Sequence, residues 1–372
     1  MKAPRENRTA APIRVLLIAP SLKIMGGHSV QAAEILTGFR AEPSARIDFL
    51  PIDQSLPWPL RWIRSVKFLR TVVNAAWFTA KLTWRIRRFD VVHVFAASNS
   101  AFLWAPAPTL ILGRLFGVPT VLNYHDGRAE GHLSRWRTAK PLIRLAARVV
   151  TPSAYLVDVF ARFGLKAQAV SNIVDVARYR YRERFPLAPV FLHNRAMEPL
   201  YNVECTVRAF EIIQRRYPHA ALTFAHTGHL RPHLERLVRD LGLEHVRFAG
   251  LVPQDRMPQL YDEADIFITS TNIDNMPLSI LESYASGVPV IATRAGGILH
   301  ISTHEETALL VDCDDHQAIA AAACRLLEDP ELALRIARNA RAQCVRYQWS
   351  AIRELWLDVY RSAISASSSN RA

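Results

Sequence analysis

Short runs of apolar residues alternate along the chain with longer segments in which apolar residues recur every three or four positions. This alternation is typical of buried parallel strands joined by crossover helices. In the first half it predicts strands at Val15–Ala19, Val91–Phe95, Thr120–Tyr124 and Arg148–Thr151. We therefore expect an α/β protein.

The alternation stops at Tyr179–Pro189, a run of Arg, Tyr, Glu and Pro without periodicity. Two doubly wound sheets joined near residue 185 are the natural interpretation, and ligands in such folds bind beyond the carboxyl ends of the strands. The strands of the second sheet are expected at Val190–His193, Leu222–His226, Val246–Ala249, Ile266–Thr269, Val290–Thr293 and Ala308–Val311.

The segment from Asp274 to Pro289 contains a helix with one polar stripe. Pro277 suits the first helical turn, and the stripe consists of Ser279, Glu282, Ser283 and Ser286. A carboxylate on an otherwise buried helix needs a partner, for which a pair of sugar hydroxyls is a good candidate. Asp274 precedes the helix N-terminus, where a phosphate could also bind. For a generic helix, a capping Asp274 and a salt-bridged, structural Glu282 would be the simpler interpretation.

This segment resembles the E-x7-E motif of glycosyltransferase family 4, with Asp274 in place of the first Glu and Glu282 as the second. Further motifs of the family follow the same order over about residues 13 to 360. They are Pro20–Gly27, Val246–Pro253, Leu260–Phe267, Ser286–Thr293 and Ala295–Gly297. The resemblance implies the GT-B architecture, two Rossmann-like domains facing across a donor cleft. It also implies transfer with retention and no metal or other cofactor.

The resemblance also implies a domain organisation. We expect an acceptor-binding domain at 13–180 and a nucleotide-sugar-binding domain at 187–346. A crossover helix at 347–366 should pack back toward the N-terminal domain. Residues 1–12 and 367–372 are expected to be disordered.

Carried over residue by residue, the resemblance implies that Glu282 binds the donor ribose and that Asp274 binds the hydroxyls of the transferred sugar. Arg195 matches the arginine that grips the donor diphosphate, which suits a bidentate guanidinium. The family usually has Lys-Gly six residues later, where this chain has Tyr201-Asn202, so at best a phenol donor replaces one cationic contact. The expected donor-binding set also includes Gly26, Gly27, Gly228, Met276 and Leu278.

His125 matches a family histidine that faces the transferred sugar, with hydrogen bonding and charge stabilisation as its expected role. Asp126 and Arg128 are candidate acceptor-binding residues. Gly26-Gly27 would let backbone N–H groups approach phosphates, although such a pair is usually only a turn. It is not GxGxxG, so a dinucleotide-dependent dehydrogenase lacks its best marker.

Two patterns imitate metal sites. Asp312-Cys-Asp314 spells D-x-D, but Asp314 and Asp315 precede a helical run at Ala318–Leu327 and are better interpreted as N-cap residues. His226, His229 and His233 have metal-like spacing, but they lie in a strand-to-helix loop around Gly228. No carboxylate or cysteine is expected to accompany them, which favours a solvated loop.

The 372 residues suffice for two domains. The four cysteines show no paired spacing, which argues against disulfides or zinc and for a reducing, cytoplasmic setting. We expect no secretory signal and no spanning helix.

The net charge of +13 is concentrated in residues 1–180, which carry 26 Lys and Arg against 10 Asp and Glu. The stretch Pro57–Arg88 combines many of these charges with Trp58, Trp62, Trp77 and Trp84. Such a composition favours an anionic membrane surface as partner, although packed tryptophans beside solvated charges would give the same pattern. No nucleic-acid-binding motif accompanies the charge, so nucleic acid is not an expected partner.

The sequence thus predicts a retaining glycosyltransferase that uses a nucleotide-sugar donor. Its acceptor is expected to be a glycolipid or polysaccharide at the inner face of the cytoplasmic membrane. Two alternatives remain open, of which the first is motivated by Tyr201 and Asp274. One is a donor-binding scaffold without activity, and the other is a GT-B relative such as a sugar-nucleotide epimerase or a phosphorylase.

Overall fold

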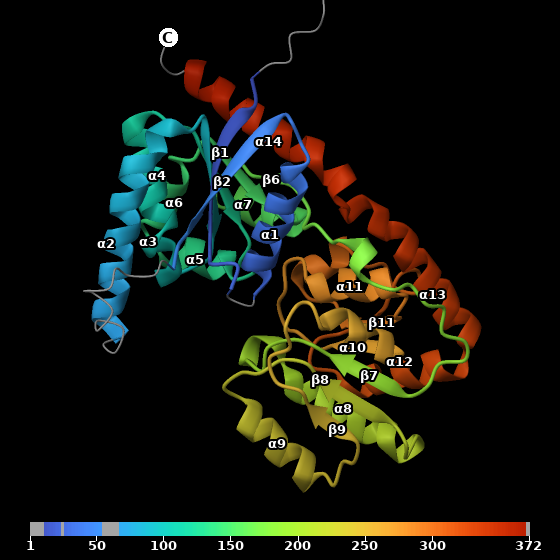
Figure 1. Ribbon diagram of the computed structural model, residues 1–372. Coiled ribbons are helices and arrows are strands. Elements are labelled where there is room, and N and C mark those ends of the chain that lie inside the picture. Colours follow the sequence, from blue (N-terminus) through green and yellow to red (C-terminus); the bar gives the residue numbers. More distant parts are fainter. Residues whose placement is uncertain (1–10, 24–25, 54–66, 370–372) are drawn as a thin grey trace, which may run out of the picture. The chain divides into compact units, whose positions relative to one another are not determined.

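The computed structural model describes residues 11–23, 26–53 and 67–369 (Figure 1). It divides into two compact units. One comprises the described parts of 1–151, 160–170 and 353–372, and the other comprises 152–159 and 171–352. Trp58 and Trp62 lie outside the described residues, as do Arg61 and Arg64 and most of the termini expected to be disordered. The expected domain boundaries stay a prediction.

The first unit is built on a parallel sheet with strand order β2-β1-β3-β4-β5-β6. Its strands are β1 (Ile13–Ala19), β2 (Ala45–Pro51), β3 (Val91–Ala96), β4 (Thr120–Tyr124), β5 (Arg148–Thr151) and β6 (Gln168–Ala169). The four predicted strands are confirmed. The prediction omitted β2 and β6, which are the two edges of the sheet.

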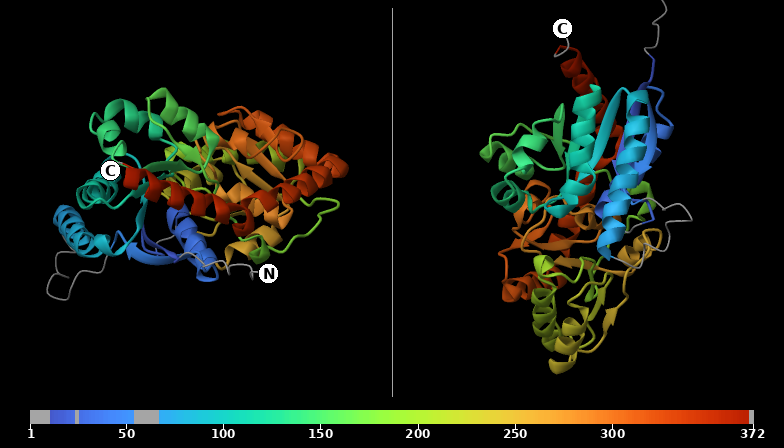
Figure 2. Two further views of the ribbon diagram at one scale, coloured as in Figure 1. Left: turned by 90° about the horizontal axis from the view of Figure 1, so that it is seen from above. Right: turned by 90° about the vertical axis from the view of Figure 1, so that its left-hand side faces the viewer.

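Both faces of this sheet are covered by helices. These are α1 (Gly27–Arg40), α2 (Lys67–Arg85), α3 (Ser100–Trp104), α4 (Pro106–Phe116), α5 (Ala129–Arg135), α6 (Ala139–Ile143), α7 (Ala154–Arg162) and α14 (Trp349–Ser369). The chain moves from β1 to β2 in one direction along the sheet and from β2 through β4 in the other. Right-handed crossovers therefore place α1 on one face and α2 and α4 together on the opposite face (Figures 1 and 2).

The C-terminal helix α14 packs on the α1 face of this sheet. The rings of Phe39 and Tyr360 lie 6.0 Å apart, and Arg353 pairs with Glu42. Tyr360 also reaches the buried imidazole of His93 on β3 through a 2.9 Å hydrogen bond. Residues 353–369 of the helix thus belong to the first unit, as the predicted return of a C-terminal helix to the N-terminal domain requires.

The second unit contains a parallel sheet with strand order β12-β11-β10-β7-β8-β9. Its strands are β7 (Val190–His193), β8 (Ala221–Phe224), β9 (Val246–Phe248), β10 (Ile266–Thr269), β11 (Val290–Thr293) and β12 (Leu309–Val311). All six were predicted. The chain order reverses between β7 and β10, and the loops after these two strands flank the position where ligands bind in doubly wound folds.

Apolar residues fill both sides of the second sheet. Its helices are α8 (Val203–Arg216), α9 (Arg231–Asp240), α10 (Met257–Glu263), α11 (Leu278–Ser286), α12 (His316–Glu328) and α13 (Pro330–Gln343). The N-cap of α11 is Pro277 itself, so the proline precedes the first turn rather than lying in it. In the described part of the chain, no helix is long and apolar enough to cross a membrane.

Candidate active site

The loop after β7 carries Arg195 to the switch point of the second sheet, where it meets Asp274 from the loop after β10. One amino group of the guanidinium forms an ion pair with the carboxylate, and both side chains are largely buried. Burial raises the pKa of Asp274 above its ordinary value, while Arg195 opposes this rise. For Arg195, burial works against the charged form, but Asp274 and its other neighbours outweigh it and raise the pKa. The guanidinium is therefore held as a cation.

Asp274 does not cap α11, because its carboxylate accepts from the amide of Asn275 and from Arg195. The backbone of this loop rests on the glycine turn that follows β11. The amide of Gly297 donates to the carbonyl of Asp274 at 2.9 Å. A Cβ at Gly297 would come within 1.6 Å of the Asn275 carbonyl oxygen, so only glycine permits this approach. The Ala-Gly-Gly turn thus fixes the position of Asp274.

The ring of Tyr201 lies under the guanidinium of Arg195, whose central carbon is 4.4 Å from the ring centroid. Tyr201 ends a short 3-10 turn at Pro199–Tyr201 and packs against the core of the second unit. This arrangement allows a cation–π contact. Tyr201 therefore contacts one face of the Arg195 guanidinium and helps to hold it in position.

The polar stripe of α11 is entirely buried, as its four members are each less than a tenth exposed. Glu282 accepts from the hydroxyl of Tyr261 at 2.8 Å and from the amide of Gln254 at 3.0 Å. Burial, and next Glu282, raise the pKa of Tyr261 well above its usual value, so its hydroxyl stays protonated and donates. Among the described residues Glu282 forms no ion pair, so it is not the salt-bridged residue of the simpler interpretation.

Ser283 and Ser286 are satisfied within the helix. Their hydroxyls donate to the carbonyls of Ser279 and Glu282, four residues earlier. The hydroxyl of Ser279, in contrast, is buried and has no hydrogen-bond partner in the part of the chain that is described. The stripe therefore contains serines that are hydrogen-bonded within the helix and one serine whose hydroxyl can still accept or donate a hydrogen bond.

Several buried polar atoms of this region have no partner among the residues that the structure describes. They include Nε of Arg195, Oδ1 of Asn194 and Oγ of Ser279, as well as Nε2 of the adjoining His193. Asn194 otherwise donates to the hydroxyl of Tyr261 at 2.7 Å, which links it to Glu282. Buried polar groups in folded proteins are nearly always hydrogen-bonded, so each of these atoms calls for a partner, which a water molecule or a ligand can supply.

Of the other expected donor-binding residues, Met276 and Leu278 lie where the Asp274 loop enters α11. Met276 is buried, and its carbonyl accepts from the side chain of Asn172 at 2.9 Å. Gly228 packs against the backbone of Met197, because a Cβ there would come within 2.4 Å of the Met197 carbonyl oxygen. Asn194, Tyr261 and Gln254 were not predicted as site residues, although Asn194 adjoins Arg195 and Tyr261 lies in a quoted motif.

In the first unit, His125 follows β4 and belongs to a cluster of rings. Its imidazole lies 5.3 Å from that of His28 and 4.9 Å from the ring of Phe95. Burial, together with the neighbouring His28 and His93, lowers the pKa of His125 well below its usual value. The imidazole is therefore neutral near pH 7.

Asp126 and Arg128 pair with one another. The guanidinium of Arg128 donates to both carboxylate oxygens, at 3.1 and 2.9 Å, and Ser98 donates to the same carboxylate through its amide and hydroxyl. Burial alone would raise the pKa of Asp126, but these hydrogen bonds outweigh it and hold the pKa well below its usual range. The carboxylate is thus a fixed anion.

Gly26 and Gly27 begin α1 as N-cap and first helical residue. A Cβ at either position would meet nothing within 4 Å. No described atom therefore occupies the space next to the Cα atoms of Gly26 and Gly27 where a Cβ would lie.

The side chains of the two metal-like patterns form hydrogen bonds and ion pairs with other residues. Asp315 caps α12 as predicted, by accepting from the amide of Ala318 at 2.8 Å. Asp314 is not a cap: it accepts from the side chain of Asn202 at 2.6 Å, which corrects the prediction. The expectation that no carboxylate accompanies the histidines is also wrong, because His229 pairs with Glu198 and His233 with Glu204. Among the described side chains, no three His, Cys, Asp or Glu gather as metal ligands would.

Comparison with known proteins assigns both halves of the chain to glycosyltransferases. The family described as "Glycosyltransferase Family 4" matches residues 27–178, and "Glycosyl transferases group 1" matches residues 181–343. The lipopolysaccharide core biosynthesis glycosyltransferase LpsD of Rhizobium meliloti is 32% identical over 305 residues, which cover 76% of this chain and 80% of that protein.

A D-inositol 3-phosphate glycosyltransferase of Acidothermus cellulolyticus is 32% identical over 241 residues. This match covers 60% of this chain and 54% of that protein, and several other relatives are likewise matched over only about half their length.

Solved structures share the fold at low sequence identity. Anabaena Alr3699/HepE, in complex with UDP and glucose, has a TM-score of 0.75 at 18% identity, covering 94% of this chain and 100% of that one. Sucrose-phosphate synthase from Thermosynechococcus elongatus has the same TM-score and identity, covering 95% and 100%. The predicted GT-B fold is confirmed, and the chain belongs to glycosyltransferase family 4, within the group 1 glycosyl transferases.

Proposed function

We propose that this protein transfers a sugar from a nucleotide-sugar donor to an acceptor hydroxyl with retention of configuration. The observation that carries the proposal is that, among the described residues, buried polar atoms of Arg195, Asn194 and Ser279 have no hydrogen-bond partner, in the region of the Arg195–Asp274 pair. A cation with an unused donor suits a diphosphate, and the neighbouring carboxylates and amide suit sugar hydroxyls. Anabaena Alr3699/HepE, which shares the fold, binds UDP and glucose.

In the proposed reaction the bond between the anomeric carbon and the diphosphate oxygen breaks, and a bond from the acceptor oxygen forms on the same face of the sugar. The acceptor proton passes to the leaving diphosphate. Arg195 stabilises the negative charge that this diphosphate gains, which is the largest electrostatic demand of the step. Asp274 holds hydroxyls of the transferred sugar, Glu282 holds the donor ribose, and the neutral His125 hydrogen-bonds to the sugar.

The test begins with thermal stabilisation of the purified protein by a panel of nucleotide-sugars, since a ligand that binds the folded state raises the melting temperature. The best donor is then incubated with acceptors, and the anomeric configuration of the product is determined by NMR. Binding without donor consumption would indicate a scaffold, and a changed donor without transfer would indicate an epimerase. We propose that the reaction needs no metal, so activity should survive EDTA.

We further propose that the acceptor lies at an anionic membrane surface and is a glycolipid or membrane-associated polysaccharide. The support comes from the adjoining C-terminal ends of α2 and α4. Trp84 and Leu115 are 68% and 71% exposed there, and the guanidiniums of Arg88 and Arg87 lie 4.1 and 4.3 Å from the ring centroids of Trp84 and Phe116. Exposed apolar side chains flanked by arginines suit the boundary between headgroups and acyl chains.

A further inference from the structure

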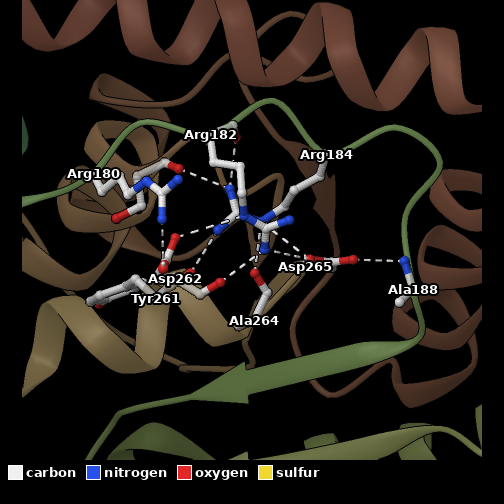
Figure 3. Close-up of polar contacts among 9 residues, drawn as sticks. Arg180, Arg182, Arg184, Ala188, Tyr261, Asp262, Ala264 and Asp265 are labelled. Carbon is white, nitrogen blue, oxygen red and sulfur yellow. Dashed lines mark hydrogen bonds and ion pairs between the residues drawn. The ribbon is translucent and has the colours of Figure 1, made fainter.

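The segment that precedes the second sheet carries arginines at alternate positions, which lie against α10 (Figure 3). Arg184 is only 3% exposed, whereas Arg180 and Arg182 lie nearer the surface. Burial, and next the adjacent Arg182, lower the pKa of Arg184 to about 10, so it remains a cation at neutral pH. A buried cation of this kind must be fully hydrogen-bonded to be tolerated.

The guanidinium of Arg184 donates to backbone carbonyls at the ends of two helices. At the C-terminal end of α10 it donates to Tyr261 at 2.7 Å and to Ala264 at 2.7 Å. At the last residue of α11 it donates to Ser286 at 2.8 Å. The final carbonyls of a helix lack partners within the helix and carry partial negative charge, so one cation satisfies both ends at once.

The two helices that Arg184 joins carry the side chains that meet at the proposed ribose site. Tyr261 comes from α10 and Glu282 from α11, and a 2.8 Å hydrogen bond joins their side chains. Tyr261 also accepts from Asn194, the neighbour of Arg195. A relative shift of α10 and α11 would therefore disturb the carboxylate of Glu282 and the start of the Arg195 loop together.

Asp265 fixes the arginine in place. Its carboxylate lies 3.3 Å from Nε of Arg184 and 3.1 Å from Arg182, and its second oxygen accepts from the amide of Ala188 at 2.7 Å. Asp265 thus orients the guanidinium of Arg184 toward the carbonyls and is itself held by the amide of Ala188 (Figure 3).

We propose that Arg184 is a positioning residue for the donor site, which holds α10 and α11 in register so that Tyr261 presents Glu282 to the ribose. This inference rests on the proposed function, in which Glu282 binds the donor. Arg184 itself touches no substrate. Its effect is on the placement of groups that bind donor equally in the ground state and the transition state.

The test compares Arg184→Met and Arg184→Lys with the matched control Arg338→Gln. Arg338 forms a two-point ion pair with Glu183 in the same segment, at 2.7 and 2.9 Å, without reaching the carbonyls of α10 or α11. Lysine keeps the charge and a long stem but cannot reproduce the fork of donors, so it separates geometry from charge.

Both Arg184 variants should raise the KM for the donor roughly tenfold and change kcat by less than about twofold, as expected when uniform binding is lost. Arg338→Gln should match the wild type in both constants. A merely structural role would reduce the amount of folded enzyme and leave the KM of the folded fraction unchanged. Should Arg184→Met fail to fold, Arg184→Lys carries the comparison.

A second readout needs no ligand. Amide hydrogen exchange in α10 and α11 of the free protein should be faster by about tenfold in the Arg184 variants than in the wild type or Arg338→Gln, because the helix ends lose their shared donor. Unchanged exchange together with unchanged donor KM would overturn the positioning role and leave the proposed function standing. A wild-type protein that binds no nucleotide-sugar would overturn the proposed function. Hydrogen exchange in the Arg184 variants would then still show whether Arg184 holds α10 and α11 together.

Discussion

Arg195 and Tyr201 form a stacked pair, with the guanidinium carbon 4.4 Å from the centroid of the phenol ring. Tyr201 stands where the family pattern has a lysine. The ring adds no second cation for a diphosphate, but it contacts the one that is present, whose Nε has no hydrogen-bond partner among the described residues. The departure from the family pattern therefore changes how the phosphate-binding charge is held.

Tyr201→Phe should retain activity within about threefold, whereas Tyr201→Ala should lower kcat/KM by roughly tenfold, because only the latter removes a cation–π contact of this kind. Steady-state kinetics with saturating acceptor would measure both. If Tyr201→Phe lost as much activity as Tyr201→Ala, the hydroxyl rather than the ring would be the functional part and the phenol would act as a donor to the phosphate.

Arg195→Ala should reduce kcat by about 10²–10³, the usual effect of removing one preorganised donor to a developing charge. The matched control is Arg294→Ala, since Arg294 is an exposed arginine of the same unit that lies 3.7 Å from Asp312. Circular dichroism and melting temperature would confirm that the variant is folded. Near-normal turnover of Arg195→Ala at saturating donor would remove the proposed site.

Glu282→Gln should raise the KM for the donor while kcat changes little, because ribose contacts contribute uniform binding. Asp274→Asn should instead lower kcat more than it raises KM, because contacts to the reacting sugar tighten in the transition state. Isothermal titration with donor, set beside kinetics, separates the two effects. Small and equal effects of both substitutions would show that the buried stripe and its preceding loop are structural.

The sequence predicted the interior strands and omitted the edges of the first sheet for a physical reason. Central strands such as β3 are buried along their whole length and give continuous apolar runs. The omitted β2 carries Arg46 and Asp48 among its apolar residues and is only partly buried, and β6 has two exposed residues. β2 therefore shows the alternation of a half-buried strand rather than a continuous apolar run, and a prediction based on continuous runs omits it.

Candidate site residues could be named from the sequence where one segment carries the motif, and their contacts could not be predicted where distant segments meet. Asp274 and Glu282 could be recognised in one stretch of sequence. The partners of Glu282 come from Gln254 and Tyr261, and nothing in their spacing indicates that a helix turns them toward α11. Arg184 lies in a segment without periodicity, so its contacts with two helix ends depend on the tertiary fold.

His93 should make the stability of the protein fall in acid. Its imidazole is completely buried between Tyr360 and Asn123, and burial lowers its pKa from 6.5 to about 3. Above pH 6.5 neither state is protonated at this residue. Between pH 6.5 and 3 the unfolded chain binds a proton that the folded protein does not, so stability is lost as the pH falls, by up to about 1.4 kcal/mol per pH unit.

Urea unfolding at several pH values would test this contribution. His93→Gln should reduce the slope of the free energy of unfolding between pH 6 and 4, whereas substitution of the exposed His219 should leave the slope unchanged. An identical slope in His93→Gln would mean that the imidazole also titrates in the folded protein.

The purified protein should sediment with vesicles that contain anionic lipid and much less with neutral vesicles. Each arginine near such a surface contributes about 1 kcal/mol, and this contribution is screened by salt, so binding should weaken as ionic strength rises.

Arg87→Gln/Arg88→Gln/Arg114→Gln should release the protein from anionic vesicles, and Trp84→Ser/Leu115→Ser should do so by removing the apolar contact. The matched control is Val345→Ser, since Val345 is 59% exposed in the other unit. Donor binding should be unchanged in all three variants, because none of the substituted residues belongs to the Arg195 site. If vesicle binding ignored lipid charge, or if Trp84→Ser/Leu115→Ser bound as well as Val345→Ser, the basic excess would be only a solvated surface and the acceptor would have to be sought away from membranes.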